Sequence, residues 1–173
     1  MNTRLDFIFT RRSARKYLNR DIPAEMPHDL IDAGMAAPSA RAADPWHFIV
    51  VTERKGLDAI AAVLPHGRML LSAPAAIVVC GDRERAPDGY ESDLLQDVSA
   101  AVENILLAAT ALGPGSCWLG VHPHQERIDG LRALFQLPPT IVPLAGIALG
   151  WPAAVPEGRT RYRPERVHSE RWQ

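Results

Sequence analysis

The sequence predicts one domain of the mixed α/β or α+β class, and three observations support this. The chain has 173 residues, a length typical of a single domain that buries roughly 70% of its unfolded surface. Short apolar runs typical of strands alternate with longer stretches of helical periodicity. Apolar residues make up 47% of the chain and charged residues 23%, which excludes disordered, collagen-like and disulfide-scaffold proteins.

The strand signals come from short runs rich in β-branched and small apolar residues. The run from Ala75 to Cys80 contains no polar residue before its cysteine, so we expect it to be buried on both faces of a sheet. Pro143 falls near the start of the last run, where a backbone donor is not required. The predicted strands are 47–52, 75–80, 116–121 and 141–149.

The helix signals come from apolar residues at helical spacing. Pro38 ends the second predicted helix, and Gly113 follows the fourth. The fourth is apolar on nearly all sides after Val98, and Asp97 or Ser99 is expected to satisfy free amides near its start. A helix this apolar predicts a central position and a dimer whose second subunit covers the remaining apolar surface. The predicted helices are 5–12, 27–37, 53–64, 93–112 and 124–134.

The net charge limits the binding partners to expect for this protein, and the cysteines indicate its cellular compartment. The net charge is −1, with 19 basic and 20 acidic residues, which argues against a nucleic-acid or membrane-surface partner. Cys80 and Cys117 lie far apart in apolar runs, so we expect buried free thiols in a reducing cytoplasm. We find no signal-peptide pattern, and the apolar runs fall short of the ~20 residues that span a bilayer.

Two basic clusters are candidates for binding an anion. Four cations and a hydroxyl lie in the segment 11–16, directly after an apolar helix, and could form charge-assisted bonds to a phosphate. Arg159, Arg161 and Arg163 alternate in the tail and would point to one side of an extended segment. The alternative for both clusters is a solvated basic surface.

Two loops contain small residues that would let a flat ligand approach the backbone. They are 37–40, which leads to the Pro45–Trp46 pair, and 113–120. The alternative is that both are ordinary connections between a helix and a strand. His122–Pro123–His124 lacks a third ligand at suitable spacing, so we expect no metal site. The sequence also contains no GxSxG, HExxH, P-loop or GxGxxG motif.

In their order along the chain, these segments resemble the FMN-dependent nitroreductase family. The matching segments are RRSARKY at 11–17, APSA to PWHFIVV at 37–51, ALGPGSCWLGV at 111–121, ALGWP at 148–152 and RTRYRPERVHSERW at 159–172. The resemblance implies an α+β fold with a mixed, mostly antiparallel central sheet flanked by helices. It also implies an interlocked homodimer with two FMN molecules at the subunit interface. Residues 1–173 would form one FMN-binding domain, with 153–173 as a tail that packs on the partner subunit.

The resemblance also assigns residues to the phosphate of FMN. Arg11 matches the family's phosphate arginine, and the adjacent Arg12 is expected to assist it. Arg161 matches a late basic residue on the same phosphate, with Arg159 as a second candidate.

Other matched positions would contact the rest of the flavin. Ser13 and Arg15 match residues at the ribityl chain and the pyrimidine edge, where Arg15 would stabilise negative charge on the reduced ring. The loop contributed by the other subunit is matched by Pro38, Ser39 and Ala40. The backbone segment near the ring is matched by Leu119 and Gly120.

The sequence departs from the family pattern in the loop before Pro45. Ala42 and Asp44 stand where relatives often have Asn and Gln. Ala42 removes an amide donor, and Asp44 introduces a carboxylate that could face the flavin, face solvent or pair with Arg41. Pro114 also replaces a common leucine, which we expect to be a structural change.

The resemblance implies an NAD(P)H-dependent oxidoreductase that passes electrons through FMN to a small electron-poor acceptor. A nitroaromatic or a quinone would suit, the mechanism would be ping-pong, and no dedicated acid–base residue is expected because the cofactor carries the chemistry. Two alternatives stay open at this point. One is a dehalogenating or flavin-degrading branch of the same fold, and the other is a non-catalytic flavin-binding protein.

Overall fold

The computed structural model describes residues 3–154, 157–158 and 160–172. They form an α+β domain around a four-stranded sheet with the order β1-β2-β4-β3, and every neighbouring pair of strands is antiparallel. The strands are β1 (Trp46–Val51), β2 (Ala75–Asp82), β3 (Gly115–Gly120) and β4 (Ile141–Gly150). The expected strands, the antiparallel sheet and the flanking helices are therefore confirmed.

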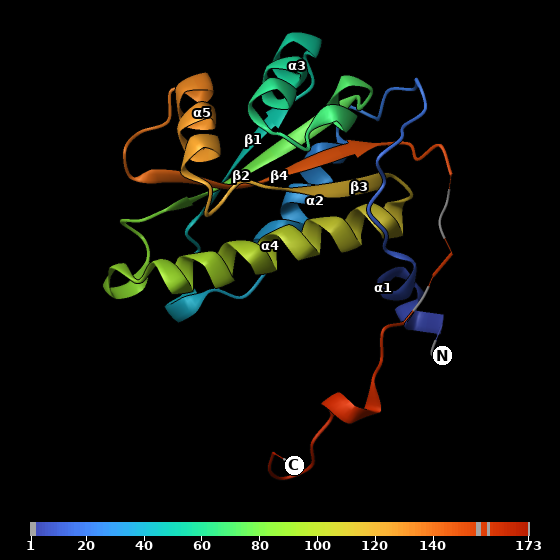
Figure 1. Ribbon diagram of the computed structural model, residues 1–173, viewed down its shortest axis with the longest axis vertical. Coiled ribbons are helices and arrows are strands. Elements are labelled where there is room, and N and C mark those ends of the chain that lie inside the picture. The colour runs from blue at the N-terminus through green and yellow to red at the C-terminus, as the bar shows by residue number, and fades with distance from the viewer. Residues whose placement is uncertain (1–2, 155–156, 159, 173) are drawn as a thin grey trace.

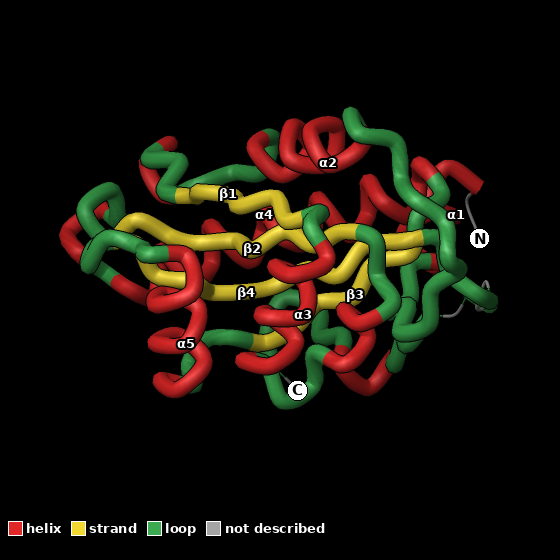
Figure 2. The backbone as a smooth tube through the Cα atoms, turned by 90° about the horizontal axis from the view of Figure 1, so that it is seen from above, coloured by secondary structure: helices red, strands yellow, loops and turns green. Residues whose placement is uncertain are grey.

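Helices cover both faces of the sheet (Figure 1). On one face lie α3 (Arg54–Val63) and α5 (Gln125–Phe135), which contact each other. On the other face lie α2 (Met26–Met35) and the long α4 (Glu91–Leu112), and the short α1 (Asp6–Thr10) contacts α4. Seen from above, the strands pass between these two layers (Figure 2).

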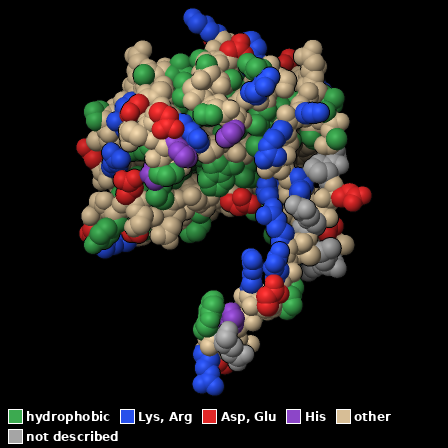
Figure 3. Space-filling view, in the orientation of Figure 1, with side chains coloured by type: hydrophobic (Ala, Val, Ile, Leu, Met, Phe, Trp, Pro, Cys, Tyr) green, Lys and Arg blue, Asp and Glu red, His purple; other side chains and the backbone are tan. Residues whose placement is uncertain are grey.

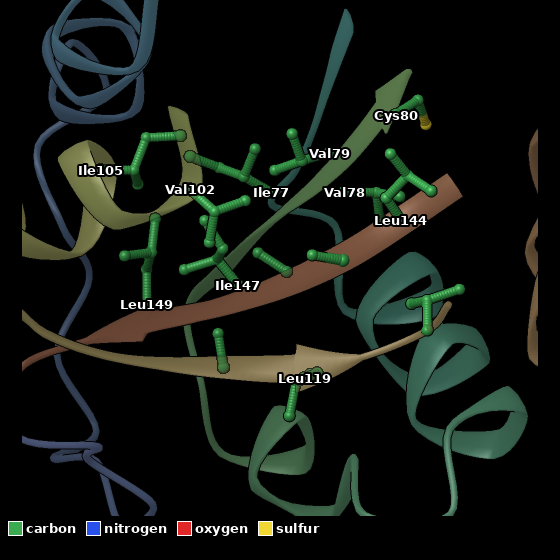
Figure 4. Close-up of a cluster of buried hydrophobic side chains, with 14 of the residues drawn as sticks. Ile77, Val78, Val79, Cys80, Val102, Ile105, Leu119, Leu144, Ile147 and Leu149 are labelled. Carbon is green, nitrogen blue, oxygen red and sulfur yellow. The ribbon is translucent and has the colours of Figure 1, made fainter. Parts of the chain in front are cut away.

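The core is centred on the two middle strands, β2 and β4. Seven of the eight residues of β2 are buried, as its apolar composition predicts. Ile77 pairs with Ile147 across these strands, and both side chains lie beside Val102 and Ile105 of α4 (Figure 4). Each such side chain contributes about 1.5–3 kcal/mol by its burial. Both cysteines are buried free thiols, as expected.

The beginning of α4 differs from the sequence prediction. The helix starts at Glu91, and its N-cap residue Tyr90 makes no side-chain capping bond. Asp97 and Ser99 therefore lie inside the helix, beyond the first turn, and the expectation that they satisfy its free amides is wrong. Gly113 ends the helix with a φ of 106°, a conformation that favours glycine.

By length and composition alone, α4 is the one helix among the described residues that could cross a membrane. Its buried residues follow one side of the helix, which packs on the sheet and on α2. This is the central position that its apolar composition predicts.

The described part of the C-terminal segment leaves the body of the domain near α1 and extends past α4 (Figure 1). Basic side chains gather where it leaves the body (Figure 3). Trp172 stacks on His168 with ring centroids 4.2 Å apart, and is otherwise 86% exposed. An exposed tryptophan at the end of an extended segment is suited to contact with another surface.

Candidate functional site

The basic segment 11–17 is fixed to the edge of the sheet. The Ala14 amide donates to the carbonyl of Ser116 in β3, over 2.9 Å. The hydroxyl of Tyr17 donates to the Ala14 carbonyl at 2.8 Å and lies 3.3 Å from the Ala148 carbonyl of β4. Burial raises the pKa of Tyr17 well above its usual range, so the hydroxyl remains a donor. A Cβ at Gly115 would lie 2.6 Å from the Cβ of Ala14, so this close approach requires glycine.

Residues from both ends of the chain form an arginine cradle at this segment. The cradle is a cavity of about 230 Å³, lined by Arg11, Arg12, Ser13, Arg15 and Arg161. Its lining contains four guanidinium groups and a hydroxyl, a donor set that suits a phosphate or another multivalent anion. The two basic clusters singled out in the sequence thus meet, through Arg161 of the tail. Arg159 lies outside the described residues.

A groove along β3 adjoins the cradle, because Arg15 lines both. The groove has a volume of about 550 Å³, and its wall includes Leu119 and Gly120, the two residues that the resemblance assigned to the backbone segment near the ring. Arg127 of α5 donates to the Gly120 carbonyl over 2.8 Å and so holds this end of the strand. The other residues of the wall are Pro65, His66, Arg68, Met69, Cys117 and Trp118.

The segment 65–69 was missed by the sequence analysis, which assigned no role to the residues after the third predicted helix. Gly67 allows the tight turn there, since a Cβ would lie 3.0 Å from the Leu64 carbonyl oxygen. Arg68, directly after this turn, is the second arginine in the lining of the groove, together with Arg15. A basic residue next to a glycine turn was the only signal in the sequence for this part of the groove.

Cys117 is a buried residue of the groove wall. Burial raises the pKa of its thiol, while the positive charge of Arg15, a hydrogen bond with Ser13 and the charge of Arg11 lower it to a smaller extent. The thiol therefore stays protonated and packs as a small apolar group.

The structure does not bring Pro38, Ser39 and Ala40 to the cradle of the same chain. Their loop lies beside the N-terminal half of α4, whereas α1, which directly precedes Arg11 of the cradle, lies toward the C-terminal end of α4 (Figure 1). The Ala40 amide donates to Asp97 of α4 over 2.9 Å, and this loop lines neither the cradle nor the groove.

The structure does not pair Asp44 with Arg41, one of the three alternatives that the sequence left open for this carboxylate. The Asp44 carboxylate accepts a hydrogen bond from the Ser39 hydroxyl at 2.6 Å, and Arg41 pairs with Asp88 at 2.6 Å. The loop folds back so that Ser39 meets Asp44, and this directs Arg41 to the segment before α4. His122 pairs with Glu91 at 2.9 Å, and no group of three His, Cys, Asp or Glu residues in the described part of the chain is arranged to hold a metal.

The fold and the site define an α+β protein in which a cradle suited to an anion adjoins a longer groove. The cradle fits the anion, and the groove fits a longer body along the edge of β3. Comparison with known proteins agrees with this class. The model of the Nitroreductase family matches residues 8–66 and 61–151, and the chain belongs to this family.

Relatives of similar length support the assignment. A protein of Methanothermobacter thermautotrophicus, provisionally named NADH dehydrogenase/NAD(P)H nitroreductase, is 45% identical over 170 residues, 97% of this chain and 87% of that protein. A similarly named structure from Parabacteroides distasonis has a TM-score of 0.92 and 41% identity, and the match covers 99% of this chain and 100% of that one. A provisionally named nitroreductase of Desulfovibrio desulfuricans, solved in complex with FMN, has a TM-score of 0.84 and 32% identity over 100% of this chain and 99% of that one.

Proposed function

We propose that the protein takes electrons from NADH or NADPH and passes them through FMN to a small electron-poor acceptor, such as a nitroaromatic or a quinone. It is an NAD(P)H-dependent oxidoreductase of the nitroreductase family. The observation that carries the proposal for this chain is the arginine cradle joined to the groove through Arg15. This arrangement fits FMN, whose phosphate suits the cradle and whose ring system suits the groove.

The residues present have separate tasks toward this cofactor. Arg11, Arg12 and Arg161 would hold the phosphate, and Ser13 would donate to the ribityl chain. Arg15 and Arg68 bring positive charge to the groove, where they would stabilise negative charge on the reduced ring. The bound flavin would supply the hydride chemistry, so the protein needs no acid–base residue of its own. Nucleotide and acceptor would occupy the groove in turn, which gives ping-pong kinetics.

The proposal includes a homodimer, with each site completed by the other subunit. The loop containing Pro38, Ser39 and Ala40 lies away from the cradle of its own chain, so it would reach the flavin of the partner subunit. Exposed apolar side chains suited to such an interface include Leu112 at the end of α4 and Trp118 of β3. The tail would pack on the partner subunit through Trp172, and the assembly would function in the cytoplasm.

Anaerobic reduction of the purified protein tests this function. We expect a yellow protein whose flavin absorbance bleaches on addition of NADH or NADPH and returns when a quinone or nitroaromatic is added. A screen of acceptors then identifies the preferred class. A yellow protein that neither nucleotide bleaches would instead support a non-catalytic flavin-binding protein, and a protein that binds no FMN would contradict the proposal.

A further inference from the structure

Residues 39–44 form a closed arch between α2 and β1. The Ser39 hydroxyl donates to the Asp44 carboxylate at 2.6 Å and accepts from the Asp44 amide at 3.0 Å. Inside this clasp, the Ala42 amide donates to the Ser39 carbonyl and the Ala43 amide donates to the Ala40 carbonyl, each over 3.1 Å. The hydroxyl proton of Ser39 is thus used within the arch.

The backbone of the arch is strained. Arg41, Ala42 and Asp44 have φ values of 54°, 52° and 48°, in the left-handed region that disfavours residues with a Cβ. Each such residue costs on the order of 1 kcal/mol, and strain of this kind persists only where the surrounding structure enforces it. Three strained residues within four positions therefore require anchors outside the arch.

The buried anchor is Asp97. Its Oδ1 accepts from the Ala40 amide over 2.9 Å, and the residue is only 6% exposed. Its Oδ2 is also buried and has no hydrogen-bond partner among the described residues. A buried carboxylate with so few donors costs folding free energy, so its position is not explained by stability.

Two other anchors lie at the surface. Arg85 donates to the Ala43 carbonyl over 2.9 Å, and Arg41 pairs with Asp88. Solvent screens exposed pairs such as Arg41–Asp88, which contribute little to stability. The bond from Ala40 to Asp97 is therefore the anchor that ties the arch to the core helix.

We propose that Asp97 is a positioning residue that holds the arch rigid before the ligand binds, so that Ser39 and Ala40 meet the partner subunit's flavin at a fixed place. This inference rests on the proposed function. It also assigns the arch a specific mode of contact. Because the Ser39 hydroxyl is committed to Asp44, the arch would meet the ring through its backbone and small side chains.

The test compares Asp97→Ala, which removes the acceptor, with Asp97→Asn, which keeps an oxygen for the Ala40 amide. Asn104→Ala is the matched control, because the Asn104 side chain also bonds α4 to a backbone carbonyl, that of Ala33, over 3.0 Å. Hydrogen exchange of residues 39–44 is measured in the flavin-free protein, and FMN is titrated into the same protein. For Asp97→Ala, we expect faster exchange in the arch and FMN binding weaker by up to about tenfold, the upper end of the range for loss of one hydrogen bond. Asp97→Asn and Asn104→Ala are expected to retain both properties of the parent protein.

Ala40→Pro provides a second variant if Asp97→Ala does not fold. It deletes the donor without changing the core, and proline suits the first position of the short helical turn that follows the extended Ser39. Its exchange in residues 42–44 should increase as in Asp97→Ala.

Three outcomes would overturn the inference: unchanged exchange in the arch, faster exchange with unchanged FMN affinity, or an equal loss of affinity in Asn104→Ala. A parent protein that binds no FMN would overturn the proposed function itself, and is recognised before any variant is compared.

Discussion

Arg11 and Glu103 form an ion pair between the end of α1 and α4, with Arg11 Nε 3.4 Å from Glu103 Oε1. The Arg11 side chain is 23% exposed and that of Glu103 is 47% exposed, so solvent screens the pair and it adds little stability. Its effect is geometric, since Glu103 holds one side of the guanidinium and leaves the remaining donors for the cradle.

Loss of an arginine from the cradle is expected to weaken FMN binding. Arg11→Ala or Arg161→Ala removes one charge-assisted contact, worth roughly 1.5–3 kcal/mol or one to two decades in affinity. Titration of FMN into the flavin-free variants measures this. Arg163→Ala is the control, because Arg163 lies in the same tail and does not line the cradle. If both cradle variants bind FMN like the parent protein, the cradle is not the phosphate site.

On dilution, FMN should be released over the same range of protein concentration in which the subunits dissociate. We expect this because the loop 38–40 lies away from the cradle of its own chain, so a lone subunit offers an incomplete site. Light scattering and flavin fluorescence over a dilution series follow the two events. A stable monomer that retains FMN at low concentration would contradict the proposed dimer.

The arch should influence the redox potential of bound FMN. Replacing Ala42 by Asn and Asp44 by Gln adds amide donors and removes a negative charge, and both changes favour the reduced, anionic flavin. We expect the midpoint potential to rise by tens of millivolts, where ~30 mV corresponds to about 1.4 kcal/mol for a two-electron couple. Spectroelectrochemistry of the double variant measures the shift, with Ala43→Asn as the control. An equal or lower potential in the double variant would show that the arch does not tune the flavin.

Ala42→Asn alone should stabilise the protein. Ala42 has a φ of 52°, a conformation that asparagine adopts at lower cost than alanine. Relief of ~1 kcal/mol would raise the melting temperature by roughly 2–4 °C in a protein of this size. Ala43→Asn is the matched control, since Ala43 has an ordinary φ of −78°. Equal melting temperatures for the two variants would indicate that position 42 stores no strain.

Stability should fall in alkaline solution because of buried thiols. Burial raises the pKa of Cys80 to about 12, whereas an exposed thiol has a pKa of about 8.5. Above pH ~8.5 the unfolded chain therefore loses this proton while the folded chain keeps it, and the free energy of unfolding decreases up to pH ~12. Urea unfolding at several pH values measures how steeply the free energy of unfolding decreases with pH. This decrease should be shallower in Cys80→Ala. A slope identical to that of the parent protein would exclude Cys80 as a cause.

Most elements could be predicted because their signals are local. The apolar run at β2 predicts a buried strand and the glycine after α4 predicts the end of that helix, and both predictions depend only on neighbouring residues in the sequence. Asp97 was taken as a capping residue because the local sequence does not distinguish an aspartate that caps a helix from one that binds a distant loop. Only its hydrogen bond with the Ala40 amide, which depends on the tertiary structure, shows the second role. The partner of Arg41 stayed open for a related reason, since closeness in sequence to Asp44 does not determine which residue it pairs with.

The basic residues of the candidate site could be recognised from the sequence because they occur in clusters. Arg11, Arg12, Ser13 and Arg15 form a continuous cluster, and Arg161 belongs to the alternating basic cluster in the tail, to which the resemblance assigned the same phosphate. Arg68 was missed because its place in the groove depends on how the turn after α3 packs against β3. That packing is a feature of the tertiary structure and cannot be inferred from the spacing of residues in the sequence.

The cradle joins Arg11 near the start of the sequence to Arg161 near its end, so its completion depends on the order of synthesis. A ribosome exposes the chain from the N-terminus, and domains fold as their residues emerge. Both α4 and β4 precede residue 161, so Arg161 is the last residue of the cradle lining to be synthesised. Under the proposed function, tight capture of the anionic ligand would wait until residue 161 has emerged and the partner subunit has completed the site.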